Sequence, residues 1–112
     1  MAVIFLNSKN NIVESTNSNI FLVFENQIFT PKIEDGCVEG VMRNFLINNA
    51  RDLKLNIVEK EIPIDFLITA DEIFLTNAIS GLMYVSAYQS RRYTGFIPKK
   101  IIPLLNEILY LN

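Results

Sequence analysis

The feature that most constrains the fold is the segment NIFLVFENQIFTP, residues 19 to 31. Its aromatic and β-branched residues favour an extended chain, and Glu25-Asn26 interrupts them with a tight turn. Pro31 ends the second apolar run because proline has no N–H group to donate to a sheet. The segment therefore predicts a β-hairpin, with strands at 19–26 and 27–30, around which the rest of the chain folds.

The remaining segments alternate between strand and helix patterns. Residues 41–54 carry an apolar stripe at helical spacing, formed by Val41, Phe45, Leu46, Ala50 and Leu53. The other predicted elements are strands at 2–7 and 11–15 around the SKNN turn, an edge strand at 55–62, a helix at 63–70 that begins with Pro63, strands at 72–78 and 81–88, a solvated RRYTG loop and a helix at 98–111. This order predicts an α/β fold, or α+β in looser usage: a mixed sheet with helices on its faces.

Composition limits the classes of protein. Half of the 112 residues are apolar, which is enough for one core, so we expect residues 1–112 to form a single domain. A net charge of −2 without a long basic run argues against a nucleic-acid partner. The absence of histidine excludes histidine-based metal sites and triads, and no metal site is expected. One cysteine fits a reducing cytoplasm, and the N-terminal apolar run is too short for a membrane span, so we expect a cytoplasmic protein.

Several separated motifs occur in a recognisable order. They are ESTNSNIF at 14–21, IFTP at 28–31, VEGVMR at 38–43 and ADEIFLTNAISGLMYV at 70–85. At these intervals they resemble the class IV aminotransferases, the pyridoxal-phosphate enzymes of fold type IV. That family includes branched-chain and D-amino-acid aminotransferases and 4-amino-4-deoxychorismate lyase. The resemblance extends from about Ile4 to Val85, and four elements in the right order make it specific.

The resemblance implies a role for Glu14, a carboxylate where a strand closes into a core. By itself, an isolated glutamate in this place would be read as a solvent-facing strand residue. In the family, the matching carboxylate contacts the pyridine nitrogen of pyridoxal 5′-phosphate and stabilises its protonated form. Asn19, Thr30 and Arg43 are in register with the same pattern. We therefore expect Glu14 to be a cofactor-binding residue.

The second implied site element is the helix start in GCVEGVMR. Free N–H groups and the positive end of the helix dipole favour a phosphate there. By resemblance, the amides of Val41 and Met42 hold the cofactor phosphate, and Gly40 lets the backbone approach closely. An ordinary glycine before a helix is the commoner meaning of such a residue. Branched-chain enzymes often carry threonine where Met42 stands, so only the backbone part of that site carries over.

The third implied element is the TNAISG turn at 76–81. Aminotransferases of the family usually supply a hydroxyl to the phosphate at the position of Ala78, whereas the deoxychorismate lyases resemble this chain in having Asn-Ala. The amides of Ala78 and Ile79 are predicted to donate to a phosphate or a substrate carboxylate. Thr76, Asn77 and Ser80 are weaker candidates because polar side chains commonly satisfy turns. The preference is slightly towards the lyase.

One part of the family pattern is missing. The resemblance implies a Schiff-base lysine on a strand before Glu14, but the one lysine there, Lys9, lies in the SKNN turn. The chain therefore carries no predicted catalytic residue, and we expect it to be the C-terminal part of a longer enzyme acting on small amino and keto acids. The alternative is a non-catalytic remnant or interaction subunit that keeps only the fold. Exposed sheet edges and apolar surface predict a homodimer or higher homo-oligomer in either case.

Overall fold

The computed structural model describes residues 4–15, 18–77, 81–85, 87–88, 91–95, 97, 99–101 and 103. The elements are β1 (Ile4–Leu6), β2 (Asn11–Ser15), β3 (Asn19–Phe24), β4 (Gln27–Thr30), η1 (Ile33–Asp35), α1 (Val41–Asn48), β5 (Asn56–Glu59), β6 (Ile62–Pro63), α2 (Phe66–Thr69), β7 (Glu72–Asn77), β8 (Gly81–Tyr84), β9 (Ala87–Tyr88) and β10 (Arg91–Arg92). No helix in the described residues is long and apolar enough to cross a membrane.

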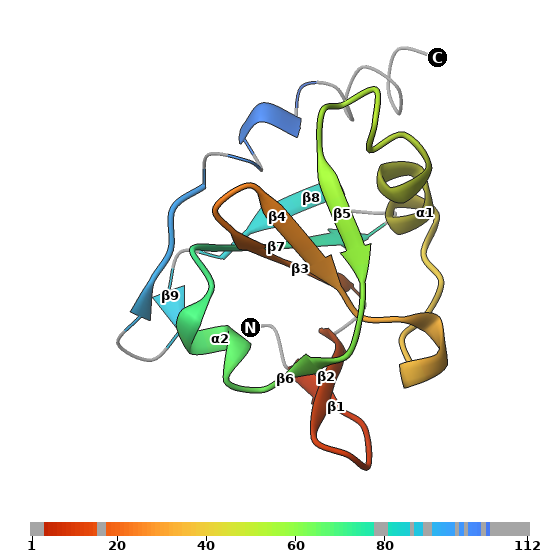
Figure 1. The fold of residues 1–112 in the computed structure, drawn as a ribbon, viewed down its shortest axis with the longest axis vertical. Coiled ribbons are helices and arrows are strands. Elements are labelled where there is room, and N and C mark those ends of the chain that lie inside the picture. The colour runs from red at the N-terminus through yellow and green to blue at the C-terminus, as the bar shows by residue number, and fades with distance from the viewer. Residues whose placement is uncertain are drawn as a thin grey trace.

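A mixed five-stranded sheet forms the centre of the molecule, in the order β5-β4-β3-β7-β8 (Figure 1). All its pairs are antiparallel except β4–β5, which is parallel because the α1 segment crosses over between the two strands. The predicted hairpin at Glu25-Asn26 is confirmed, and Glu25 has a left-handed φ of 56° in its turn. The α/β class and the mixed sheet are therefore confirmed.

Strand β3 is buried on both sides because each face of the central sheet is covered. Phe21 and Val23 point towards α1, in the cluster that contains Met42 and Leu46. Ile20 and Leu22 point to the opposite face, where Ile12, Ile62 and Leu67 come from β2, β6 and α2. In Figure 1, α1 and the β1-β2-β6 group accordingly lie on opposite sides of the sheet. One face is thus covered by a helix, and the other by a small sheet together with α2.

The helix predicted at 41–54 is shorter than expected. It ends at Asn48, and the side chain of Asn49 donates from Nδ2 to the Phe45 carbonyl at 2.8 Å. Asparagine side chains compete with the helix for backbone carbonyls, which explains the early stop. The predicted apolar stripe was also wrong in its first residue: Val41 is 75% exposed, whereas Met42 is 3% exposed. The buried face therefore follows Met42 and Leu46.

Two further predictions are corrected. Pro63 does not begin a helix: it lies in β6, paired with Asn11, because the neighbouring Ile62 is buried against Ile12. The strand predicted at 81–88 divides into β8 and β9, and β9 pairs with β10 inside the stretch predicted as a solvated loop. There, Tyr93 is buried and donates its hydroxyl to the Leu67 carbonyl. Of the helix predicted at 98–111, residues 99–101 and 103 are helical, and the others lie outside the described residues.

Candidate functional site

A cavity of about 270 Å³ opens where β2, β3, β7 and α1 meet. Ligand sites commonly occupy about 300–1,000 Å³, so this space suits part of a small ligand. It is lined by Glu14, Ser18, Asn19, Val38, Gly40, Val41, Met42, Thr76 and Asn77. Four residues predicted from the sequence, Glu14, Gly40, Val41 and Met42, are therefore brought together on one cavity.

Glu14 reaches the cavity because β2 ends in a tight reversal. Ser15 and Ser18 exchange backbone hydrogen bonds of 3.0 and 3.1 Å, so β3 begins directly beside the end of β2. Oε1 of Glu14 accepts the N–H of Val38 at 2.8 Å. Its second oxygen has no hydrogen-bond donor within the described part of the chain. The half-buried carboxylate is thus fixed through one oxygen and can accept from a ligand through the other.

The loop before α1 brings Val38 over Glu14. Gly36 adopts a left-handed φ of 118°, which glycine tolerates at low cost, and its N–H closes the short helix η1 on the Ile33 carbonyl. The turn at Gly36 lets residues 37–40 pass the end of β2 on the way to α1. Val38 consequently lies next to both Glu14 and Asn19.

The first turn of α1 presents free N–H groups. Gly40 is the N-cap and has no capping side chain, while its carbonyl accepts the N–H of Asn44 at 3.0 Å. No acceptor for the N–H groups of Val41, Met42 and Arg43 exists among the described residues. Such groups and the helix dipole together favour an anion. The Met42 side chain belongs to the core cluster, and its N–H is one of the free donors of this turn.

Gly40 is required by its neighbour rather than by its own backbone angles. Its φ of −72° is accessible to any residue. A Cβ atom at this position would lie 2.3 Å from Oδ1 of Asn19, well inside contact distance. The close approach that the structure shows at Gly40 is that of the Asn19 amide, and the predicted approach of a phosphate stays a prediction.

Strand β7 ends with Thr76 and Asn77, two polar residues that were weaker candidates in the sequence analysis. Thr76 is 1% exposed, and its Oγ1 has no hydrogen-bond partner among the described residues. Asn77 donates from Nδ2 to Oγ of Ser18 at 3.2 Å. A buried hydroxyl without a partner beside a cavity is costly unless a ligand or water completes it. Ser18 and Val38 were not predicted, because only the folded loops bring them to the cavity.

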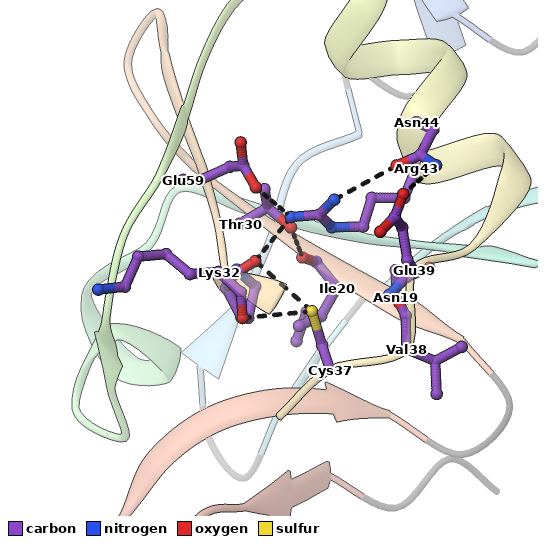
Figure 2. A network of polar contacts seen from close by, with 11 residues as sticks. Asn19, Ile20, Thr30, Lys32, Cys37, Val38, Glu39, Arg43, Asn44 and Glu59 are labelled. Carbon is purple, nitrogen blue, oxygen red and sulfur yellow. Dashed lines mark hydrogen bonds and ion pairs between the residues drawn. The ribbon is translucent and has the colours of Figure 1, made fainter. Parts of the chain in front are cut away.

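Behind the cavity, Arg43 holds the first turn of α1 to the central sheet (Figure 2). Its Nη2 donates to Oε1 of Glu59 at 2.5 Å and to the carbonyl of Pro31 at 3.0 Å. Cys37 lies beside this group, with Sγ 3.6 Å from the Pro31 carbonyl oxygen. Burial raises the pKa of the Cys37 thiol, and the positive charge of Arg43 partly opposes that rise. Arg43 is not among the cavity-lining residues, so it supports the site from behind.

The remaining predicted residues fall into two groups. Thr30 is buried but donates to the Ile20 carbonyl at 2.8 Å, so its role is in the sheet. Ala78 and Ile79 lie outside the described residues, and their cofactor contacts stay predictions. No lysine lines the cavity, and the described residues contain no group of three or more potential metal ligands.

Comparisons with known proteins show the family of this chain. Residues 2–88 match the model of the family described as amino-transferase class IV. A probable branched-chain-amino-acid aminotransferase of Thermotoga maritima is 34% identical over 94% of this chain and 38% of its own length. The aminodeoxychorismate lyase of Bacillus subtilis is 36% identical over 80% of this chain and 31% of its own length.

Among solved structures, a branched-chain aminotransferase from Thermoproteus uzoniensis with norvaline superposes with a TM-score of 0.91 at 32% identity. The match covers 96% of this chain and 37% of that protein. The chain thus spans about a third of the length of the relatives that it matches.

Proposed function

This chain belongs to the amino-transferase class IV family, and from that premise we propose that its cavity forms part of a site for pyridoxal 5′-phosphate, the cofactor of that family. One observation carries the proposal. The carboxylate of Glu14 and the free N–H groups that begin α1 line the same cavity. A ligand with a protonated ring nitrogen at one end and a phosphate at the other is complementary to such a pair of groups.

The unsatisfied groups of the cavity fit this cofactor. Glu14 offers an acceptor to a pyridine N–H, while Val41 and Met42 offer backbone donors to phosphate oxygens. The orphaned hydroxyl of Thr76 is a further donor that a phosphate would satisfy. Ala78 and Ile79 complete the proposed set through their amides.

The chain's own residues bind and orient rather than react. When bound, pyridoxal phosphate supplies an electron sink that stabilises negative charge next to the substrate nitrogen. Glu14 would hold a proton on the ring nitrogen, because a nearby carboxylate favours the charged form. The N–H groups of α1 hold the anionic end without a change in protonation. Arg43 does not touch the cavity and steadies α1 from behind.

The activity of the whole protein follows the family. We propose an aminotransferase acting on small amino and keto acids, or a lyase acting on aminodeoxychorismate, because the two relatives are a probable branched-chain-amino-acid aminotransferase and an aminodeoxychorismate lyase. The slight preference for the lyase rests on Ala78, which lacks the hydroxyl usual in the aminotransferases. Glu14, Val41 and Met42 serve the cofactor in both cases and do not choose between them.

The second candidate is a non-catalytic domain that keeps the fold and associates with another chain. It is favoured by the absence of a lysine among the residues that line the cavity. We propose a single domain over residues 1–112 and homo-association through exposed apolar residues, of which Phe5 and Leu6 lie on strand β1 at the edge of its sheet. A cytoplasmic location is part of the same proposal, since Cys37 is a free thiol.

Binding of pyridoxamine 5′-phosphate tests the proposed function. This ligand has no aldehyde, so it cannot react with surface lysines, and its fluorescence reports binding. Glu14→Gln should weaken binding about tenfold, because an amide cannot hold the pyridine proton as a carboxylate does. Glu61→Gln, at an exposed glutamate outside the cavity, is the matched control and should change nothing. Equal affinity of the Glu14→Gln variant and the wild type would contradict the assignment of Glu14.

A further inference from the structure

Asn19 lies between the Glu14 carboxylate and the start of α1, the two parts of the cavity that are proposed to bind the ligand. It is the first residue of β3, is 6% exposed and lines the cavity. Its Nδ2 donates to the Val38 carbonyl at 2.6 Å, and Figure 2 includes both residues. Its Oδ1 faces the backbone of Gly40, so closely that a Cβ atom would lie 2.3 Å away. One side chain thus contacts both Val38, which binds Glu14, and Gly40, the N-cap of α1.

Short contacts lead from Asn19 to both proposed ligand-binding groups. Val38, which receives the Asn19 hydrogen bond, donates its own N–H to Glu14 at 2.8 Å. The Val38 carbonyl also accepts the N–H of Gly40 at 3.0 Å. Moving the Asn19 amide would therefore disturb the carboxylate through Val38 and the start of the helix through Gly40.

The two ends of the amide have different requirements. The Val38 carbonyl accepts a second hydrogen bond from Asn19 beside the one from Gly40, and neither aspartate nor leucine can donate it. The Gly40 side needs a flat group small enough to lie against a glycine backbone. An aspartate would keep the shape but place a negative charge beside the Val38 carbonyl oxygen and near Glu14. Asparagine meets both requirements at once.

We propose that Asn19 is a positioning residue that sets the distance between the Glu14 carboxylate and the N–H groups at the start of α1. The proposal rests on the proposed function, since that spacing matters only for a ligand that bridges the two groups. Asn19 acts through Val38 and Gly40 and is not a catalytic residue. Its substitution should change binding of the whole ligand and also the protonation of the ligand's ring.

The geometric part is tested by a double-mutant cycle in urea unfolding. Gly40→Ala should lower the unfolding midpoint of the wild type, because its methyl group meets Oδ1 of Asn19. In the Asn19→Ser background the shorter side chain leaves room, so Gly40→Ala should lower the midpoint by less than half as much. Equal effects in both backgrounds would overturn the Asn19–Gly40 contact and with it the proposal.

The ligand part uses pyridoxamine 5′-phosphate and the full chain. Asn19→Asp should bind about tenfold more weakly than the wild type, since it loses the donor to Val38. Asn56→Asp is the control: it makes the same charge change on the exposed edge strand β5, where the amide bonds only Gln27 at 2.8 Å. It should leave affinity unchanged. Asn19→Ser serves as a second variant, and circular dichroism checks the fold of each.

A spectroscopic signature separates positioning from a purely structural role. The pH at which the bound ring nitrogen loses its proton should fall in the neutral variant Asn19→Ser towards its value in Glu14→Gln. Adding Glu14→Gln to Asn19→Asp should cost little more affinity, because Glu14 is already displaced. If the wild type binds the ligand and the folded Asn19→Asp and Asn19→Ser variants bind it with the same affinity, only the role of Asn19 is overturned. A wild type that does not bind would overturn the proposed function and this proposal together.

Discussion

Arg43 and Glu59 form an ion pair of 2.5 Å in which 3% of the arginine side chain is exposed against 43% of the glutamate side chain. The pair joins the first turn of α1 to β5, the edge strand of the central sheet. Water can solvate Glu59 if its partner is lost, whereas Arg43 would remain buried with an uncompensated charge. The two halves of the pair are therefore unequal in what they contribute to stability.

This inequality predicts the order of two substitutions. Glu59→Ala should destabilise the fold by about 2 kcal/mol. Breaking a fully buried pair costs about 3–5 kcal/mol, and the loss is smaller here because Glu59 is partly solvated. Arg43→Met should cost less, about 1 kcal/mol, since an apolar chain fills the space and the main loss is the hydrogen bond to Pro31. Urea unfolding measures both. A larger loss for Arg43→Met than for Glu59→Ala would contradict the argument.

Thr76 should show opposite effects on stability and on binding. Thr76→Val removes a buried hydroxyl that has no partner in the described residues, so the free protein should gain about 1 kcal/mol. If that hydroxyl meets the phosphate, affinity for pyridoxamine 5′-phosphate should fall about tenfold. Thr30→Val is the control, because its hydroxyl is bonded to Ile20 and its loss should destabilise the fold. Thermal unfolding and fluorescence titration give the two readouts, and unchanged affinity would remove Thr76 from the site.

Cys37 predicts a pH dependence of stability. Burial raises the pKa of its thiol above the ordinary value of 9.0, so the folded state binds the thiol proton more tightly than the unfolded state. This contribution is fully present below pH 9.0 and is lost as pH rises through the folded pKa. The unfolding free energy of the wild type should therefore fall more steeply above that pH than that of Cys37→Ala. Parallel curves for the two proteins would show that the thiol does not contribute.

The lysines predict that this chain does not hold pyridoxal phosphate covalently. All six lysines lie in the described residues, and none lines the cavity. Incubation with pyridoxal phosphate followed by dialysis should leave no stoichiometric visible absorption band. Mass spectrometry after borohydride reduction should find only scattered modification. A single stoichiometric lysine adduct would show that another lysine serves the site.

Ala78 predicts a small effect on cofactor binding. Ala78→Thr should change the affinity for pyridoxamine 5′-phosphate by no more than about 0.5–1.5 kcal/mol, the net contribution of one hydrogen bond. It should not by itself create transaminase activity in an enzyme that contains this sequence. Assays with aminodeoxychorismate and with amino acid and keto acid pairs test the second point. Efficient branched-chain transamination without pyruvate release would reverse the lyase preference.

The sequence by itself determined the elements whose signals are local. The turn residues Glu25-Asn26 and the block at Pro31 fixed the β3–β4 hairpin, because each acts on its own stretch of backbone. The family motifs likewise identified Glu14, Gly40, Val41 and Met42, which line one cavity. Such features depend on residue type and short spacing, and both can be read along the chain.

The tertiary structure decided the features that depend on distant neighbours. The buried face of α1 begins at Met42 rather than Val41, because packing against the sheet determines which side of the helix is covered. Pro63 joined β6 because Ile62 pairs with Ile12, a residue fifty positions away. Neither the contact of Asn19 with Gly40 nor the orphaned hydroxyl of Thr76 has any signal in the sequence. Side-chain contacts between separate strands and loops arise only when packing brings their backbones together.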